Sequence, residues 1–338
     1  MRKMSKKIIV SVLTLVLTVV ALGTTTYAWF TVGGTVATEE FEMDVTSGIG
    51  LEVAYMPTGT TVPTNPKLNY VKTISQKSLL SHLYIDYVLD GNVDEIENIS
   101  TSTYDDLWKA YFEMDAFTTT DGRQMQTINE TTDEEGNANV NLVNAAKTQG
   151  FVEFKLAFRT KQGLTSEEAL PLILNQIGLR SNGVLFTTPT PYMTKAGSIH
   201  NPNDDPLQIS ATNATRISFA DENNEALTTV YEKAESELNT YLGTNTFGWG
   251  YGAHDFYKNQ TQTDLEEIFE EHEVMTTKTI ASLNEDTIAT FAQRNGEEAY
   301  RYAVITIRIW LEGFDAETFN AIFDDKLFFR FGFNIVIE

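Results

Sequence analysis

The chain has 338 residues, of which 42% are hydrophobic and 11% aromatic, so it can bury a large core and is not a disordered polymer. Its formal net charge is −23, and a surface so negative repels nucleic acid and anionic lipid, which argues against both as partners of the folded part. The absence of cysteine excludes disulfides, thiol catalysis and Cys-ligated zinc.

The first residues have the layout of a secretory signal peptide. A start with four Lys or Arg residues precedes residues 8–22, which are apolar apart from three hydroxyl side chains. Thr26 and Ala28 suit the −3 and −1 pockets of a signal peptidase, so the mature chain would begin at Trp29. The alternative is an uncleaved signal anchor, because the charge-free stretch is long enough to span a bilayer. Cleavage is the interpretation that we favour, and membrane contact would then end with it.

The alternation of apolar residues changes phase just after this predicted cut. Phe30, Val32 and Val36 occupy even positions, whereas the apolar residues of the stretch 39–46 occupy odd ones. A shift by one residue turns the apolar set to the opposite face, which predicts two strands, or one strand broken near residues 37–39. The first segment is therefore detachable: it either pairs within its own subunit as an edge strand or is donated to a neighbour.

The junction Tyr27-Ala28-Trp29-Phe30-Thr31 resembles the precursors of the TasA/camelysin family, which Gram-positive bacteria secrete and trim with a SipW-type signal peptidase. Two later stretches, residues 151–159 and 305–315, are similar to the same group. The resemblance covers residues 1–50 and these two strands. It implies a jelly-roll β-sandwich that polymerises into extracellular fibres, in which each subunit lends its N-terminal segment to a neighbour as a strand.

The function that this resemblance implies is that of a secreted structural subunit of a biofilm matrix or cell surface, not an enzyme. The donor strand would carry Trp29, Phe30, Val32 and Val36, and the partners would be copies of the chain itself, the SipW-type peptidase and other matrix proteins. One alternative is a secreted hydrolase, because camelysin has been classed as a metalloprotease. Another is a monomeric surface adhesin or binding module with aromatic and Pro-rich loops.

The predicted organisation is a signal peptide at residues 1–28, a donor segment at 29–38 and a mainly β domain at 39–338. Long insertions are expected at about 57–150, 160–212 and 221–298, with short helices among them.

Three strands of the domain are distinct in the sequence. Residues 151–159 alternate as a strand of an antiparallel sheet with one wet face, and residues 302–311 are apolar enough for a strand covered on both faces. Residues 327–337 alternate through six large apolar positions and predict a central strand. Residues 118–141 are polar and predict a loop.

Catalytic and metal-binding motifs are not found. The four histidines are His82, His200, His254 and His272, and none lies within five residues of another. The stretch 272–276 starts like a zincin helix but ends in threonine where the second histidine belongs. We therefore predict no catalytic residues, metal ligands or cofactor.

Weakly bound Ca²⁺ is the one ion that the composition leaves open. Residues 90–94 begin like an EF-hand but lack its glycine, and residues 133–137 offer oxygens without the spacing. Both stretches are expected to be solvated loops. The negative charge either serves solubility or lets divalent cations bridge carboxylates between subunits.

Overall fold

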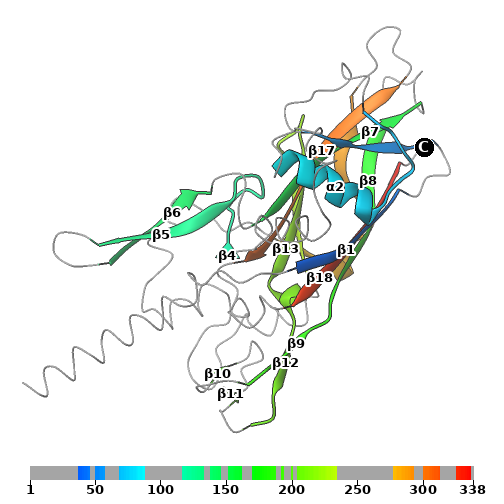
Figure 1. The fold of residues 1–338 in the computed structure, drawn as a ribbon. Helices are drawn as coiled ribbons and strands as arrows, with labels where there is room; N and C mark the ends of the chain where they lie inside the picture. Colours follow the sequence, from blue (N-terminus) through cyan, green and yellow to red (C-terminus); the bar gives the residue numbers. More distant parts are fainter. Residues whose placement is uncertain are drawn as a thin grey trace, which may run out of the picture.

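The computed structural model describes residues 37–45, 50–57, 68–87, 116–132, 138–145, 151–161, 170–187, 192–193, 199–200, 204–233, 277–292, 300–312 and 325–335. Within these residues the fold is mainly β: two sheets pack together, and short two-stranded ribbons extend from them (Figure 1). This confirms the mainly β, sandwich-like prediction, and the jelly-roll arrangement stays a prediction.

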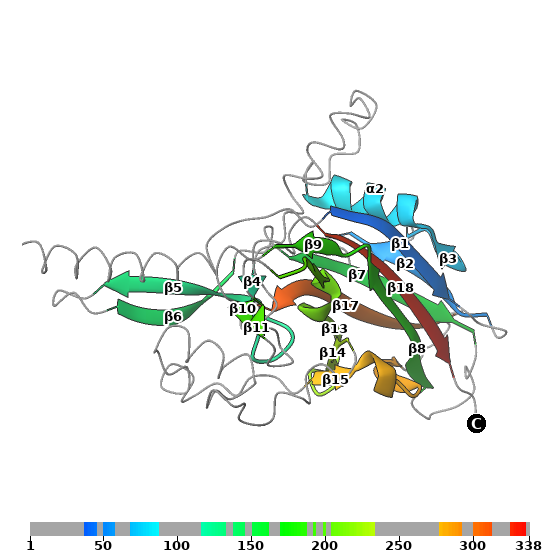
Figure 2. The ribbon, with the colours of Figure 1, turned by 90° about the horizontal axis from the view of Figure 1, so that it is seen from below.

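The first sheet has five strands, and the parallel pair β1/β18 distinguishes it from an all-antiparallel sheet. In spatial order its strands are β16 (Asp286–Phe291), β8 (Leu170–Ser181), β18 (Lys326–Ile335), β1 (Ala37–Val45) and β3 (Thr73–Ile74). β18 is therefore central, between β8 and β1, as the sequence predicts (Figure 2).

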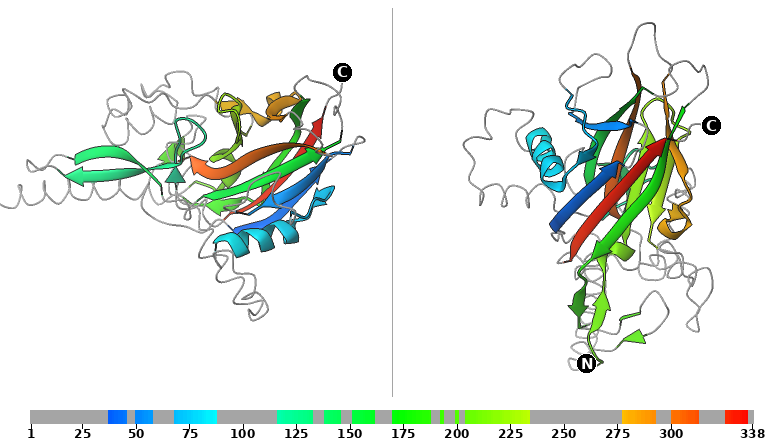
Figure 3. Two further views of the ribbon diagram at one scale, coloured as in Figure 1. Left: turned by 90° about the horizontal axis from the view of Figure 1, so that it is seen from above. Right: turned by 90° about the vertical axis from the view of Figure 1, so that its right-hand side faces the viewer.

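The second sheet has seven strands and faces the first (Figure 3). Its path is β15 (Thr277–Thr279), β14 (Thr228–Glu232), β13 (Thr215–Asp221), β17 (Arg301–Glu312), β7 (Val152–Thr160) and β2 (Glu52–Met56), with β4 (Ala116–Phe117) beside β17. The pairs β13/β17, β17/β7 and β7/β2 are antiparallel, and they form the body of this sheet.

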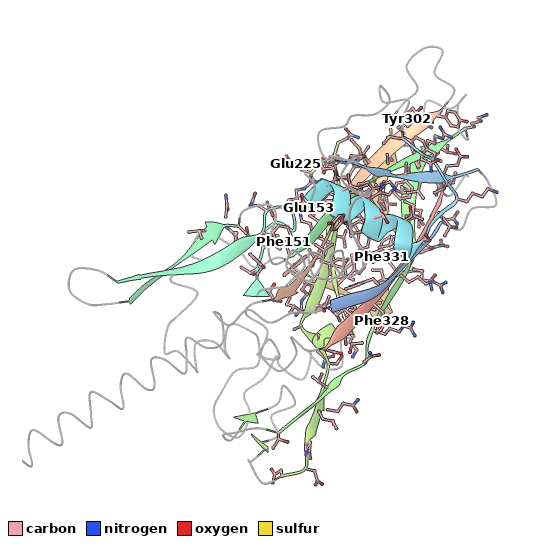
Figure 4. The ribbon with its side chains drawn as sticks, viewed as in Figure 1. Phe151, Glu153, Glu225, Tyr302, Phe328 and Phe331 are labelled. Atoms are coloured by element: carbon pink, nitrogen blue, oxygen red, sulfur yellow. The ribbon has the colours of Figure 1, made fainter. Side chains whose placement is uncertain are left out.

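The core lies between the two sheets and is rich in phenylalanine. On β18 the inward positions are Leu327, Phe329, Phe331, Phe333 and Ile335, each at most 3% exposed. Phe331 meets Phe219 of β13 edge-on with ring centroids 5.3 Å apart, and Phe333 meets Phe158 of β7 at 4.9 Å. Figure 4 labels Phe331 among the side chains that fill this space.

β7 and β17 also match their predicted patterns. Along β7 the even positions are buried, while Glu153, Lys155 and Arg159 are half-buried on the other face. There they pair across strands: Glu153 with Arg308 and Arg159 with Glu52, both at 2.6 Å. Nearly every position of β17 is buried, as expected of a strand covered on both faces.

Several strands lie inside stretches that the sequence analysis leaves to insertions. β8 falls within 160–212, and β14, β15 and β16 fall within 221–298. The pattern did not reveal β8, because Leu170-Pro171-Leu172-Ile173-Leu174 is apolar without alternation and contains a proline. β14 to β16 are three to six residues long, too short for periodicity to identify.

The predicted polar loop at 118–141 is wrong in part, because residues 126–132 and 138–141 belong to the strands of a β-hairpin. β5 (Gln126–Thr132) and β6 (Ala138–Asn144) pair antiparallel along their whole length. Their Thr- and Asn-rich sequence lacks the alternation of a core strand, because the hairpin does not belong to either sheet. Two further ribbons join β9 (Val184–Phe186) to β12 (Leu207–Ile209) and β10 (Tyr192–Met193) to β11 (Ile199–His200).

Asp221 joins the two sheets where β16 lies against β13. The carboxylate is 1% exposed and accepts the backbone N–H of Asn223 at 2.8 Å and of Thr290, on β16, at 3.0 Å. Burial raises the pKa of Asp221, and the two N–H groups oppose that shift. On the same side Ala292 N donates to Tyr302 O at 2.9 Å, so this edge of the sandwich is closed.

We expect Asp221→Ala to lower the free energy of unfolding by roughly 2–4 kcal/mol, because it removes a buried carboxylate that accepts two partly buried backbone N–H groups. Chemical denaturation measures the change. Glu225→Ala, at an exposed position of the β13–β14 loop, is the control and should stay within about 0.5 kcal/mol of the wild type. Equal effects of the two substitutions would contradict the assigned role of Asp221.

Candidate assembly edge

The outer edge of β1 is mostly without a strand partner among the described residues. On one side β1 pairs with β18 from Ala37 to Val45. On the other side only Met43 and Asp44 pair, with the two residues of β3. Residues 37–42 therefore present one row of backbone groups that no described strand satisfies. Such an edge is a template for another strand.

β1 carries a register shift at its start. Thr38 lies opposite Leu327 and Glu40 opposite Phe328, so Glu39 is an extra residue in this strand. The shift lies at the position where the sequence predicts the break, but the first of the two predicted strand segments is outside the described residues before Ala37 and stays a prediction. Ala37 and Thr38 thus pair with β18 in a different phase from residues 40–45.

Helix α2 (Gln76–Tyr87) lies beside β1 and covers the same side of the sandwich (Figure 2). Ser75 caps it: its carbonyl accepts Leu79 N at 2.9 Å, and its Oγ accepts Ser78 N at 3.3 Å. Leu79, Leu83 and Tyr84 are at most 1% exposed. The first two belong to the core between the sheets.

Sequence reasoning missed α2, which lies in the predicted insertion at 57–150. A signal was present, because Ser75 precedes apolar residues at helical spacing, Leu79 and Leu83.

A polar contact fixes α2 to β2 of the opposite sheet. The hydroxyl of Tyr55 donates to Asp86 Oδ2 at 2.5 Å. The Tyr55 ring stacks on His82 with centroids 4.9 Å apart and an interplanar angle of 6°. Burial lowers the pKa of His82, and the nearby Asp86 carboxylate partly opposes that shift. These contacts hold the helix over the β1 side, and the environment of His82 favours its neutral form.

The predicted processing and donor residues are outside the described part of the chain. They are Thr26, Ala28, Trp29, Phe30, Val32 and Val36. The same holds for His254, His272 and the two stretches with calcium-like composition, 90–94 and 133–137. Of the predicted donor segment 29–38, the structure describes only Ala37 and Thr38, which pair with β18 of the same chain, and donation by residues 29–36 stays a prediction.

The described residues contain no group of three His, Asp or Glu side chains placed to hold a metal ion. His82 lies in α2 and His200 in β11.

We expect the stability of the wild-type protein to fall as the pH drops below about 6.5, the ordinary pKa of histidine. His82 has a lowered pKa in the folded state, so the unfolded chain takes up its proton first, and protonation favours unfolding. Denaturation midpoints between pH 5 and 8 measure this dependence.

His82→Phe keeps an aromatic ring against Tyr55 but cannot titrate, so its stability should change less over the same pH range. If the two proteins have the same pH dependence, His82 does not control the docking of α2.

Comparison with known proteins found no matching family model, no similar curated protein and no similar solved structure. Across the described ranges, no helix combines the length and apolar character needed to cross a bilayer. The functional argument therefore rests on the sequence and on the geometry of the β1 edge.

Proposed function

We propose that this chain is a secreted structural subunit that assembles with copies of itself into extracellular fibres of a bacterial matrix. In this proposal a SipW-type peptidase removes residues 1–28, and the new N-terminal segment adds as a strand to the next copy. The role is structural and not catalytic. The sandwich would have the jelly-roll arrangement implied by the resemblance to the TasA/camelysin family.

The open outer edge of β1 is the observation that carries the proposal. Residues 37–42 lack a strand on that side within the described structure, because β3 reaches only Met43 and Asp44. An added strand would satisfy this row by main-chain hydrogen bonds. Trp29, Phe30, Val32 and Val36 would set its register through alternate side-chain positions.

The charge distribution supports donation by this segment. Copies of a chain with net charge −23, which loss of the four basic residues of the leader would make −27, repel one another, yet residues 29–38 contain no charged side chain. Such a segment can approach a second copy without adding repulsion. Residues 29–36 precede the first β1/β18 pair, Ala37 with Lys326, so their addition to another copy would not require that register to change.

Deletion of residues 29–36 should leave folded, soluble protein that forms no filaments. The deletion stops before Ala37 because Ala37 and Thr38 pair with Lys326 and Leu327 within the sheet. Electron microscopy tests for filaments, and circular dichroism tests for the fold. Normal filaments from the shortened chain would rule out donation by this segment.

A synthetic peptide of residues 29–38 should slow filament growth by competing for the β1 edge of free subunits. The control is the same peptide with Phe30, Val32 and Val36 replaced by serine, which keeps the length and charge but removes the apolar side chains. Light scattering during assembly measures the difference. Equal inhibition by the two peptides would contradict register selection by these residues.

A further inference from the structure

The β5–β6 hairpin extends away from the sandwich but has a firmly packed base (Figures 1 and 3). At the base, Met125 and Phe117 pack with Trp310 of β17 on the outer face of the seven-stranded sheet. Arg123 Nε donates to Thr228 Oγ1 at 2.7 Å, and its Nη2 donates to Asp221 O at 2.8 Å. The hairpin is therefore anchored at one end, while its strands belong to neither sheet.

Hydrogen bonds at the base show which backbone groups of the hairpin point outward. Ala145 N donates to Met125 O at 2.9 Å, so residue 145 points toward β5. Directions alternate along an antiparallel strand, so the N–H and C=O groups of Ala138, Val140, Leu142 and Asn144 point away from β5. No described strand pairs with this outer edge of β6.

The two edges of the hairpin differ. On β5 the outward edge begins at Gln126, which exchanges both backbone hydrogen bonds with Thr118 at 2.8 and 2.9 Å. β5 also contains the acidic Glu130, whereas β6 has the sequence Ala-Asn-Val-Asn-Leu-Val-Asn, without a charge. The β6 edge is thus both unpaired among the described strands and uncharged.

Because β6 carries no charge, we favour a second copy of this chain as the partner that pairs with its outer edge. Two bodies of net charge −23 repel each other over most surfaces, so contact is least opposed where the local sequence is neutral. Val143 of β6, 38% exposed, is one of two exposed large hydrophobic side chains among the described residues. An isolated two-stranded hairpin is also only marginally stable, and further strands would stabilise it.

We propose that β6 is a self-docking edge, through which two copies join their hairpins into one four-stranded antiparallel sheet. For the two β6 strands to pair, residues whose backbone N–H and C=O groups point outward must lie opposite one another. A two-fold axis at Asn141 meets this requirement, because it places Val140 of one copy opposite Leu142 of the second copy. This contact rests on the proposed self-assembly and gives it a second, lateral interface. A single contact of seven residues per copy is small, and repetition along a fibre strengthens it.

Cysteine cross-linking tests the contact directly, because the chain has no cysteine of its own. At the two-fold axis the two copies of residue 141 would form a non-hydrogen-bonded pair with Cα atoms about 4.5 Å apart, within the range that a disulfide spans. We expect Asn141→Cys to form a covalent dimer under mild oxidation. The matched control is Asn129→Cys, the residue paired with Asn141 on β5. Dimerisation at 141 should be at least ~10-fold faster than at 129.

A proline pair tests the edge through the backbone alone. Val140→Pro removes an outward N–H from β6 and leaves the ladder to β5 intact, so it should abolish the fast cross-linking of Asn141→Cys. Glu130 of β5 lies opposite Val140, and its N–H points outward on the other edge of the hairpin. Glu130→Pro removes that N–H and should leave cross-linking unchanged. Loss of cross-linking with both prolines, or with neither, would overturn docking through the β6 edge.

The outcomes separate this inference from the proposed function. If filaments form and residue 141 cross-links no faster than residue 129, the β6 contact is wrong and strand donation is unaffected. If residue 141 cross-links rapidly while filaments do not depend on residues 29–36, the β6 contact is supported and strand donation is wrong.

Discussion

The packing of phenylalanine side chains between the two sheets is the interaction on which the rest of the structure depends. Phe331 and Phe333 of β18 lie against Phe219 of β13 and Phe158 of β7. These contacts fix β18 at the centre of its sheet, since its inner face cannot leave the core without exposing these rings to water. Because β18 is fixed, its neighbours β8 and β1 are placed as well.

The two sides of the sandwich are closed by different means. On the β16 side, Asp221 and a backbone hydrogen bond from Ala292 tie the sheets together. On the β1 side, α2 fills the space with Leu79 and Leu83 and is held by the Tyr55–Asp86 contact. A helix covers apolar surface but offers no backbone groups to a strand, so α2 does not satisfy the backbone groups on the outer edge of β1.

The charge of the chain limits where the proposed self-assembly could occur. On the outer face of the seven-stranded sheet the basic side chains of Lys155, Arg159 and Arg308 are each paired with a carboxylate, which leaves the acidic excess of the chain uncompensated. In the proposed assembly, association between copies would then use main-chain hydrogen bonds and neutral segments. Residues 29–38 contain no charged side chain in the sequence. β6 also lacks charged side chains, and its outer edge has no partner among the described strands.

The sequence alone determined the strands whose side chains alternate against a core and the break in phase near Glu39. Residues 151–159 and 327–335 alternate in this way, whereas residues 302–311 were identified as a nearly continuous apolar run, and each stretch is a strand in the structure. Only the tertiary structure decided which strands pair, that β3 stops after two residues, that β8 belongs in the sheet, and that β5 and β6 stand apart from it. The physical reason is that periodicity records which face of a strand is buried. Which strands pair, and which edges stay unpaired, depends instead on backbone hydrogen bonds between residues far apart in the chain, and these leave no local pattern in the sequence.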